Sequence, residues 1–199
     1  AGADISQFGA MREGETATAA YDAAYLQGCT AVSDAGKPSI SVIRGVCFGG
    51  GVGLAMACDL RLARADCRFR VPAARLGLGY AYAGIALLAT RLGLSVTADL
   101  MLSARLVAGV EALRLGIVNA LWDAERFERE SGDYIARIGA NAPLTLRAVK
   151  LALIALARPE ADRDTSAAEA AVAACLASAD YREGQRAFTE KREPVFTGD

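Results

Sequence analysis

The sequence contains no histidine, and this absence removes several kinds of catalytic site. Ser-His-Asp triads and Cys-His pairs both use an imidazole as the general base. The usual zinc sites also depend on histidine ligands. Any acid–base chemistry therefore has to come from Asp, Glu, Tyr, Lys or water.

Cysteine is present, but no two cysteines have the CxxC spacing of metal sites or redox-active pairs. Most of them lie in apolar sequence, which is typical of buried, reduced thiols in the cytosol. The cysteines are Cys29, Cys47, Cys58, Cys67 and Cys175. We therefore expect a cytoplasmic protein without disulfides and without a bound metal ion.

The chain also lacks the features that mark nucleic-acid and membrane partners. Its formal net charge is −1, so there is no excess of basic residues to attract phosphates. No charge-free apolar stretch is long enough to span a bilayer. The first residues, AGADISQF, have neither the basic nor the apolar region of a signal peptide. We expect neither nucleic acid nor a membrane as a partner.

Apolar periodicity and turn residues predict an α/β core followed by a run of helices. In chain order we expect a helix over 11–35, a strand over 39–46, a helix over 50–57, two short strands between 60 and 71, helices over 84–93 and 95–104 with Ser95 as a cap, and a helix stopped by Gly116 before a strand. Helices are then expected over 124–138, 142–158 and 164–191. This order predicts a core over residues 1–124 and a helical region over 125–199.

The segment CFGGGVGLAMACDL, residues 47–60, places Gly49, Gly50 and Gly51 at the start of a predicted helix. A strand that leads into such a helix presents unpaired N–H groups and the positive end of the helix dipole, with no Cβ in the way. The alternative is that these glycines only allow tight packing of strand against helix. A Rossmann phosphate loop is excluded because Leu54 stands where that motif needs a small residue.

Five segments in order resemble the enoyl-CoA hydratase/isomerase (crotonase) superfamily: AGADI, KPSISVIRGVCFGGGVGLAMACDLRLA, FRVPAARLGLG, LVAGVEALRLGIVN and FTEKREPVF. The resemblance covers essentially the whole chain. It implies a crotonase-like β-β-α spiral core, whose N-terminal strands are absent from this sequence, and a C-terminal helical trimerisation region. It further implies an acyl-CoA substrate, no cofactor beyond that coenzyme A thioester, and a homotrimer or a dimer of trimers.

The resemblance assigns roles to the two glycine-rich segments. In the family, a thioester carbonyl oxygen accepts two backbone N–H bonds, and the matching donors here are Ala3 and Gly50. An enolate formed from the thioester is stabilised there, since one such donor is worth about 3 to 4 kcal/mol. Neighbouring residues implied to line the substrate site are Gly2, Asp4, Ile5, Phe48 and Gly49. Asp4 is in the family chiefly a structural residue of the oxyanion loop.

The two glutamates with which hydratases of this family add water are both missing. One belongs three residues after the oxyanion glycine, where this chain has Gly53. The other follows a proline, where Pro72 is followed by Ala73. Because a general acid or base contributes about 10²- to 10⁴-fold, we expect hydration to be slow. Gly53 and Ala73 are also compatible with a pocket enlarged for a bulkier acyl group.

The loop LGLGYAYAGI, residues 76–85, replaces the family loop that lines the acyl pocket, and so implicates Leu76, Tyr80 and Tyr82. A similar tyrosine-bearing loop occurs in the methylmalonyl-CoA decarboxylase branch. Decarboxylation needs an oxyanion hole and only a weak proton donor afterwards, which a tyrosine supplies. The alternative for both tyrosines is pocket lining with a hydroxyl bonded to the backbone. Arg75 either pairs with a substrate carboxylate or is a solvated loop residue.

Near the C-terminus, Phe188 and Lys191 match family positions that contact coenzyme A. The alternative is that EKRE is an ordinary exposed helix end.

Our main hypothesis is an enoyl-CoA hydratase/isomerase-like enzyme that stabilises a thioester enolate and is poor at hydration. The alternatives are a decarboxylase-type reaction that uses Tyr80 and a non-catalytic acyl-CoA-binding protein.

Overall fold

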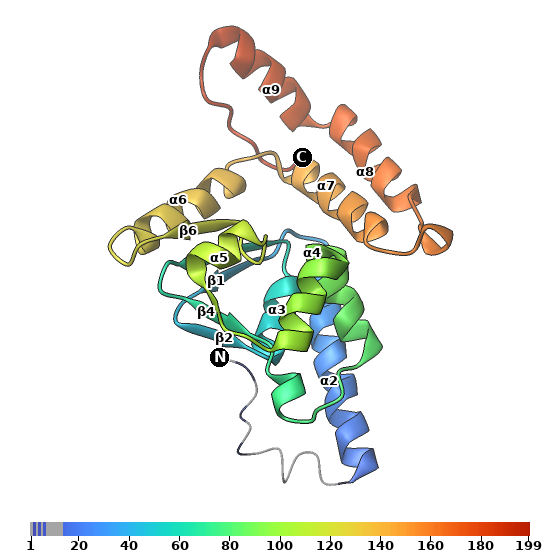
Figure 1. Ribbon diagram of the computed structural model, residues 1–199. Helices are drawn as coiled ribbons and strands as arrows, with labels where there is room; N and C mark the ends of the chain where they lie inside the picture. Colours follow the sequence, from blue (N-terminus) through green and yellow to red (C-terminus); the bar gives the residue numbers. More distant parts are fainter. Residues whose placement is uncertain (1, 3, 5, 7–13) are drawn as a thin grey trace. The chain divides into compact units, whose positions relative to one another are not determined.

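A computed structural model describes residues 2, 4, 6 and 14–199, and the chain divides into two compact units. The first unit comprises residues 1–34 and 39–130, and the second comprises residues 35–38 and 131–199 (Figure 1). The boundary between core and helical region that the sequence suggests near residue 125 stays a prediction. The two units are described separately below.

In the described part of the first unit, six short strands form two three-stranded sheets. One sheet has the order β1 (Ile40–Ile43), β3 (Leu60–Arg64), β6 (Ala120–Trp122), and all its pairs are parallel. The other has the order β2 (Val46–Phe48), β4 (Arg68–Arg70), β5 (Val107–Ala108), with β2 parallel and β5 antiparallel to β4. The chain alternates between the sheets, so β1, β2 and a helix are followed by β3, β4 and a helix. This repetition is the β-β-α spiral.

The single strand expected over 39–46 is wrong, because the chain turns at Arg44 and Gly45 and leaves the first sheet for the second. The run of β-branched residues that predicted the strand covers β1 and the start of β2 alike. The two short strands expected between 60 and 71 are confirmed as β3 and β4.

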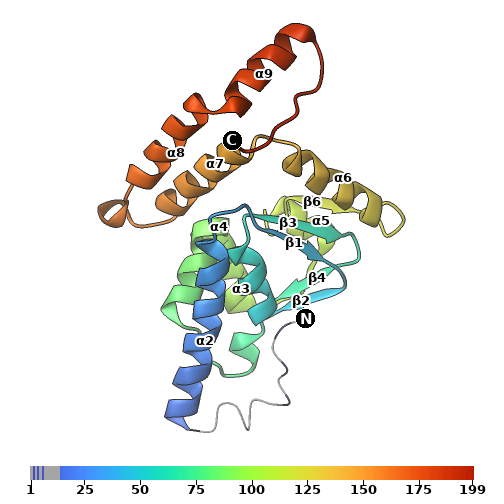
Figure 2. The ribbon, with the colours of Figure 1, turned by 180° about the vertical axis from the view of Figure 1, so that it is seen from behind.

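The helices of this unit are α2 (Glu15–Ser33), α3 (Gly50–Ala57), the short 3₁₀ helix η2 (Ala73–Arg75), α4 (Tyr82–Ser103) and α5 (Gly109–Arg114). Helix α3 is apolar on every side, which is typical of a helix that is covered all round. Helices α2 and α4 both pack against it (Figures 1 and 2). Met56 of α3, Leu62, Phe69 and Leu88 are almost completely buried and belong to the core of this unit.

Helix α4 is interrupted at Gly93, which has φ 76° and ψ 163°. Such a positive φ is accessible to glycine without the steric cost that a Cβ imposes. The expectation of two successive helices is therefore confirmed. The expected cap at Ser95 is wrong, because the break falls at Gly93 and Ser95 already lies inside the second helix.

By length and composition alone, α4 would be able to cross a membrane. Helices α6 (Phe127–Gly139) and α7 (Pro143–Leu156) are long and apolar enough only when they are taken together as one span, which is bent by 98°. Core helices of water-exposed proteins often meet it too, so the indication is weak. Leu88 and Leu100 of α4 face the hydrophobic core, and Nε of Arg91 donates to the Met56 carbonyl at 3.2 Å. These contacts show that one side of α4 packs against the core of the first unit.

The second unit is helical. It contains most of α6 (Phe127–Gly139), then α7 (Pro143–Leu156), η3 (Glu160–Asp162), α8 (Ser166–Ala177) and α9 (Ala179–Glu190). Helices α7 and α8 pack along each other. The single helix expected over 164–191 is wrong, because the chain leaves helical geometry at Ser178. The Ser178 hydroxyl accepts a hydrogen bond from the Tyr181 N–H at 3.0 Å and so caps α9.

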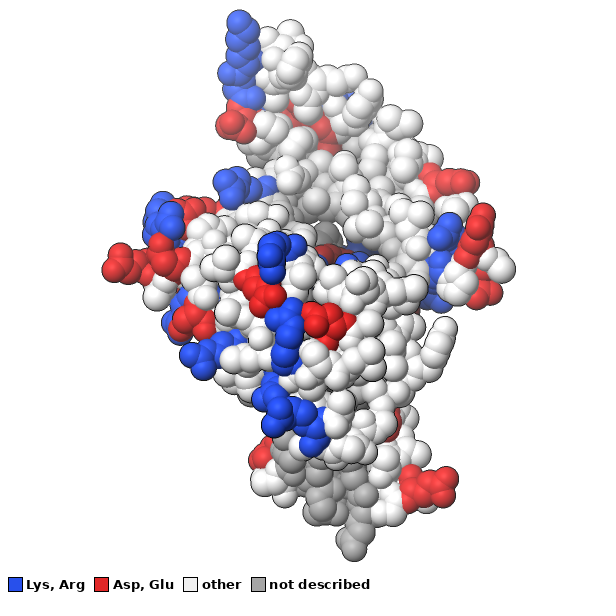
Figure 3. All heavy atoms as spheres, in the orientation of Figure 1, with Lys and Arg blue, Asp and Glu red and all other residues white. Residues whose placement is uncertain are grey.

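Charged side chains of both signs lie next to one another on the face seen in Figure 3. In the first unit, for example, the Arg105 guanidinium bonds Asp99 at 2.6 Å and Glu111 at 2.9 Å. This mixture agrees with the net charge of −1.

Candidate active site

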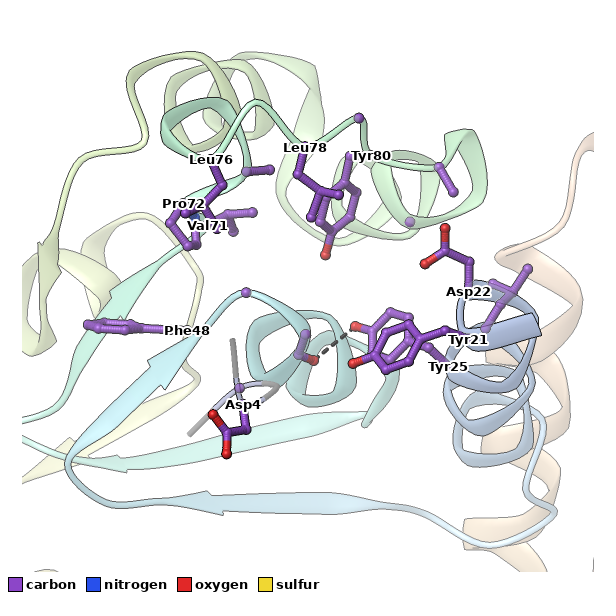
Figure 4. Close-up of a pocket in the computed structure, with 18 of the residues that line it drawn as sticks. Asp4, Tyr21, Asp22, Tyr25, Phe48, Val71, Pro72, Leu76, Leu78 and Tyr80 are labelled. Atoms are coloured by element: carbon purple, nitrogen blue, oxygen red, sulfur yellow. Dashed lines mark hydrogen bonds between the residues drawn. The ribbon is translucent and has the colours of Figure 1, made fainter. Parts of the chain in front are cut away.

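A pocket of about 720 Å³ lies within the first unit, between α2, the start of α3, η2 and the loop that leads to α4 (Figure 4). Of the residues that the sequence implicated, nine line it: Gly2, Asp4, Phe48, Gly49, Gly50, Pro72, Ala73, Leu76 and Tyr80. The wall is mainly apolar, and it is completed by residues that the sequence did not single out, among them Tyr21, Asp22, Tyr25, Val71 and Leu78.

The glycine turn forms one end of this pocket. Gly49 has φ 51° and ψ −118°, a conformation that side chains disfavour, and its N–H donates to the Arg70 carbonyl at 2.8 Å. Helix α3 begins at Gly50, so the N–H of Gly50 is one of the first-turn donors that have no partner inside the helix. The turn is thereby tied to strand β4, and the helix N-terminus opens onto the pocket.

Gly2 lies against this turn. A Cβ on Gly2 would come closer than 3.0 Å to the Phe48 carbonyl oxygen, and it would lie 3.5 Å from the Gly51 nitrogen. Only glycine fits at this approach. Ala3, the second expected oxyanion donor, and Ile5 lie outside the described residues, so their roles stay predictions.

Asp4 has a local role in the same segment. Its carboxylate accepts hydrogen bonds from the Ser6 hydroxyl at 2.7 Å and from the Ser6 N–H at 3.0 Å. These bonds hold the pKa of Asp4 below its usual value. The carboxylate is therefore engaged in shaping its own loop, as expected for a structural residue.

Two tyrosine hydroxyls surround the position of the first missing glutamate. A Cβ on Gly53 would come closer than 3.0 Å to Oη of Tyr25 and would lie 3.7 Å from Oη of Tyr80. Tyr25 extends from α2 and donates its hydroxyl hydrogen to the Gly50 carbonyl at 2.9 Å (Figure 4). Burial raises the pKa of both tyrosines, so both are neutral at physiological pH.

The second missing glutamate belongs at Ala73, which is buried in η2 and lines the pocket. Its carbonyl accepts hydrogen bonds from the N–H groups of Leu76 and Leu78, both at 3.0 Å. The acidic side chains on the described wall are Asp4 and Asp22 instead, and none of the described wall residues is Lys or Arg. Arg75 is exposed and does not line the pocket.

Besides Arg75, four described residues that the sequence implicated do not line this pocket: Gly53, Tyr82, Phe188 and Lys191. Gly53 is buried within α3. Tyr82 begins α4 and is 86% exposed. Phe188 of α9 is 87% exposed, and Lys191 follows the same helix in a left-handed conformation with φ 55°. Phe188 and Lys191 belong to the second unit, and their contact with coenzyme A stays a prediction.

Sequence reasoning missed Tyr21, Asp22 and Tyr25 of α2. Tyr21 and Tyr25 are four residues apart, so they lie on one face of the helix, and Figure 4 shows both at the pocket. That spacing was a visible signal. The sequence alone does not tell which side of α2 faces α3, because alanines occupy much of the helix.

Comparison with known proteins identifies the family. The sequence model described as Enoyl-CoA hydratase/isomerase matches residues 1–199. The chain belongs to this family. Among curated relatives, a short-chain-enoyl-CoA hydratase of Clostridium acetobutylicum is 32% identical over 160 residues, which cover 79% of this chain and 60% of that protein. A carnitinyl-CoA dehydratase of Proteus mirabilis is 31% identical over 193 residues, 95% of this chain and 74% of that protein.

Solved structures of the family have the same fold. An enoyl-CoA hydratase/carnithine racemase from Magnetospirillum magneticum superposes with a TM-score of 0.90 at 32% identity, covering 100% of this chain and 73% of that one. A putative enoyl-CoA hydratase/isomerase family protein from Hyphomonas neptunium gives 0.90 at 33% identity, with 100% and 76% coverage. The α/β crotonase fold is thus confirmed. The chain spans about three fifths of the length of the first curated relatives that it matches.

The site combines a helix N-terminus, a mainly apolar wall and neutral phenols in one pocket. Within the described part of the chain, no group of three or more His, Cys, Asp or Glu side chains is arranged to hold a metal ion.

Proposed function

We propose that this enoyl-CoA hydratase/isomerase family member binds an acyl-CoA thioester in the pocket and stabilises its enolate through the N–H groups of Gly50 and Ala3. The observation that carries the proposal is the N-terminus of α3, which opens at Gly50 onto a mainly apolar pocket. Donors fixed in a site of low polarity stabilise a developing oxyanion far better than they do in water.

Hydration is proposed to be slow. An efficient hydratase has to orient water and deliver a proton, and neither Gly53 nor Ala73 carries a group for this. Tyr25 also fills the space beside Gly53. The reaction is therefore proposed to be one that proceeds through the enolate without a pair of carboxylates.

Decarboxylation of a carboxylated acyl-CoA is the second candidate, and the neutral Tyr80 beside Gly53 favours it. Loss of carbon dioxide leaves the bonding electron pair on the α carbon, as the thioester enolate, which then needs a proton. The described wall offers no Lys or Arg to hold a substrate carboxylate. The negative charge is therefore better stabilised after it has moved to the thioester oxygen near α3.

The helical second unit supports a further part of the proposal, assembly into a homotrimer or a dimer of trimers. Val149 and Leu153 of α7 and Val172 and Leu176 of α8 are exposed apolar side chains. Such apolar surface is typical of an interface. A cytoplasmic location completes the proposal.

Gly50→Pro tests the proposal, with Gly50→Ala as the matched control. Gly50 is the first helical residue, where proline is tolerated, so the helix is kept while the N–H donor is lost. The control keeps the donor and adds a Cβ at 3.2 Å from Tyr25 Cε2. We expect Gly50→Pro to lower turnover by about 10²- to 10³-fold and Gly50→Ala to lower it far less.

The assay follows enoyl, carboxylated and saturated acyl-CoAs, the last by exchange of the α hydrogen with deuterated water. Unchanged turnover in folded Gly50→Pro protein would remove the oxyanion hole from this site. Saturable binding without product or exchange from any thioester would favour the non-catalytic alternative.

A further inference from the structure

Tyr25 connects three parts of the pocket that are far apart in the sequence. Its ring extends from α2, its hydroxyl donates to the Gly50 carbonyl at 2.9 Å, and its oxygen lies at the place where a side chain on Gly53 would begin. Tyr80 reaches the same place from the loop before α4, with Oη 3.7 Å from that point. Figure 4 shows the two phenols directed toward each other across the pocket.

We propose that Tyr25 is a positioning and specificity residue, which fixes the first turn of α3 for stabilisation of the enolate and closes the site to hydration. This inference rests on the proposed enolate chemistry at Gly50. Tyr25 itself transfers no proton in it.

The positioning effect follows from the hydrogen bond. The Gly50 carbonyl belongs to the peptide that joins Gly50 to Gly51, and a bond to a ring held between α2 and α3 restricts rotation of that peptide. A glycine-rich turn has more freedom to rotate than any other, so an external anchor matters most here. The donor N–H of Gly50 lies in the same first turn, and small misplacements of reacting groups cost large factors in rate.

The specificity effect follows from volume. The place beside Gly53 holds the Tyr25 hydroxyl, so a carboxylate-bearing side chain has no room there. The site is left with phenols that stay protonated, which suits delivery of a proton to an enolate and does not suit activation of water.

Tyr25→Phe tests the positioning effect, because it keeps the ring and removes only the hydroxyl. The matched control is Tyr181→Phe, since Tyr181 is half exposed on α9 and does not line the pocket. The measurements are the rate of carbon dioxide release from methylmalonyl-CoA at saturation, which forms the enolate without a base, and the dissociation constant of that thioester. We expect Tyr25→Phe to slow carbon dioxide release about tenfold or more while the dissociation constant changes less than about twofold. The control should alter neither.

A residue that only packs α2 against α3 would change stability and leave the rate of carbon dioxide release per folded molecule unaltered. Release by Tyr25→Phe at the wild-type rate would therefore overturn the positioning effect alone. A wild-type protein that binds no acyl-CoA would instead overturn the proposed function, and the catalytic part of this inference with it.

A double-mutant cycle with Gly53→Ala tests the volume argument without any activity. In the wild type the new Cβ would crowd the Tyr25 oxygen to less than 3.0 Å, whereas in the Tyr25→Phe background its closest neighbour is Cζ at 3.2 Å. The loss in urea midpoint caused by Gly53→Ala should therefore shrink by at least half in the Tyr25→Phe background. Equal losses in both backgrounds would overturn the claim that the Tyr25 hydroxyl occupies this place.

Discussion

Restoring the two family glutamates should create hydratase activity only if Tyr25 is removed at the same time. The variant is Gly53→Glu with Ala73→Glu and Tyr25→Ala. Ala73 lines the pocket, whereas Gly53 is buried in α3 beside it, and a side chain at position 53 would come within 3.0 Å of the Tyr25 oxygen. Real Cβ atoms almost never approach other atoms so closely, so Tyr25 has to leave its place.

The contacts of Tyr25 set the energetic penalty for Gly53→Glu alone. Displacing Tyr25 breaks its bond to the Gly50 carbonyl, worth about 0.5 to 1.5 kcal/mol net. Overpacking a well-filled site adds about 1 to 3 kcal/mol. Gly53→Glu in the wild-type background should therefore cost about 1.5 to 4.5 kcal/mol of unfolding free energy. Tyr25→Ala removes the crowding. The loss in unfolding free energy of the combined variant should therefore be about 1 to 3 kcal/mol smaller than the sum of the losses of the separate variants.

The expected gain in rate is smaller than the family's own glutamates would supply. Each general acid or base contributes about 10²- to 10⁴-fold when it is well supported. Here the new carboxylates have no designed partners, and Tyr25→Ala also loosens the glycine turn. We expect the triple variant to hydrate crotonyl-CoA about 10- to 100-fold faster than the wild type. Variants with one glutamate should gain little, because the two groups act together.

The assay is the loss of enoyl absorbance of crotonyl-CoA, measured on the wild type, the single variants, the double glutamate variant and the triple variant. Equal hydration by the double and triple variants would refute the steric argument about Tyr25. Efficient hydration by the wild type would refute the larger claim that Gly53 and Ala73 leave the site without the needed chemistry.

Three further predictions concern stability and assembly. Burial raises the pKa of Tyr25 above about 10, the pKa of a tyrosine in the unfolded chain. The free energy of unfolding should therefore fall as the pH rises above about 10, and urea titrations of Tyr25→Phe should show a weaker fall. Hydrogen bonds from Arg192, the Val195 N–H and Arg186 hold the pKa of Glu183 below 4.5. The ionised Glu183 carboxylate therefore stabilises the fold above that pH, and this stabilisation is lost on acidification. Glu183→Gln should make unfolding, followed by circular dichroism, less sensitive to acid. Light scattering of the protein at micromolar concentration should give the molar mass of a trimer or hexamer. Val149→Glu on the exposed face of α7 should reduce that mass. A monomeric wild type would contradict the proposed interface.

The sequence predicted most of the first unit because its signals are local or ordered along the chain. The glycines at 49–51 marked the start of α3, and Gly116 marked the end of α5. The spiral followed from the resemblance, since strand periodicity alone does not tell which sheet a strand joins. For that reason the turn at Arg44 and Gly45 was missed.

The pocket was predicted only where it is built from the motifs themselves. Nine implicated residues line it, but Tyr25 was missed because its role depends on how α2 docks on α3. Ser178 was missed for a different reason. The alanine-rich sequence on both sides of it favours helix, and only the capping bond to Tyr181 marks a new start.

The crowding between positions 25 and 53 also restricts the order in which such a pocket can change by single mutations. A tyrosine at position 25 is incompatible with any side chain at position 53 unless the ring moves. A path of single mutations between a site with a carboxylate at 53 and a site with a tyrosine at 25 must therefore pass through a chain with glycine at 53 and a small residue at 25, which has neither the carboxylate nor the Tyr25 hydroxyl. The effect of each step depends on the other position, so at least one such intermediate separates the two sites.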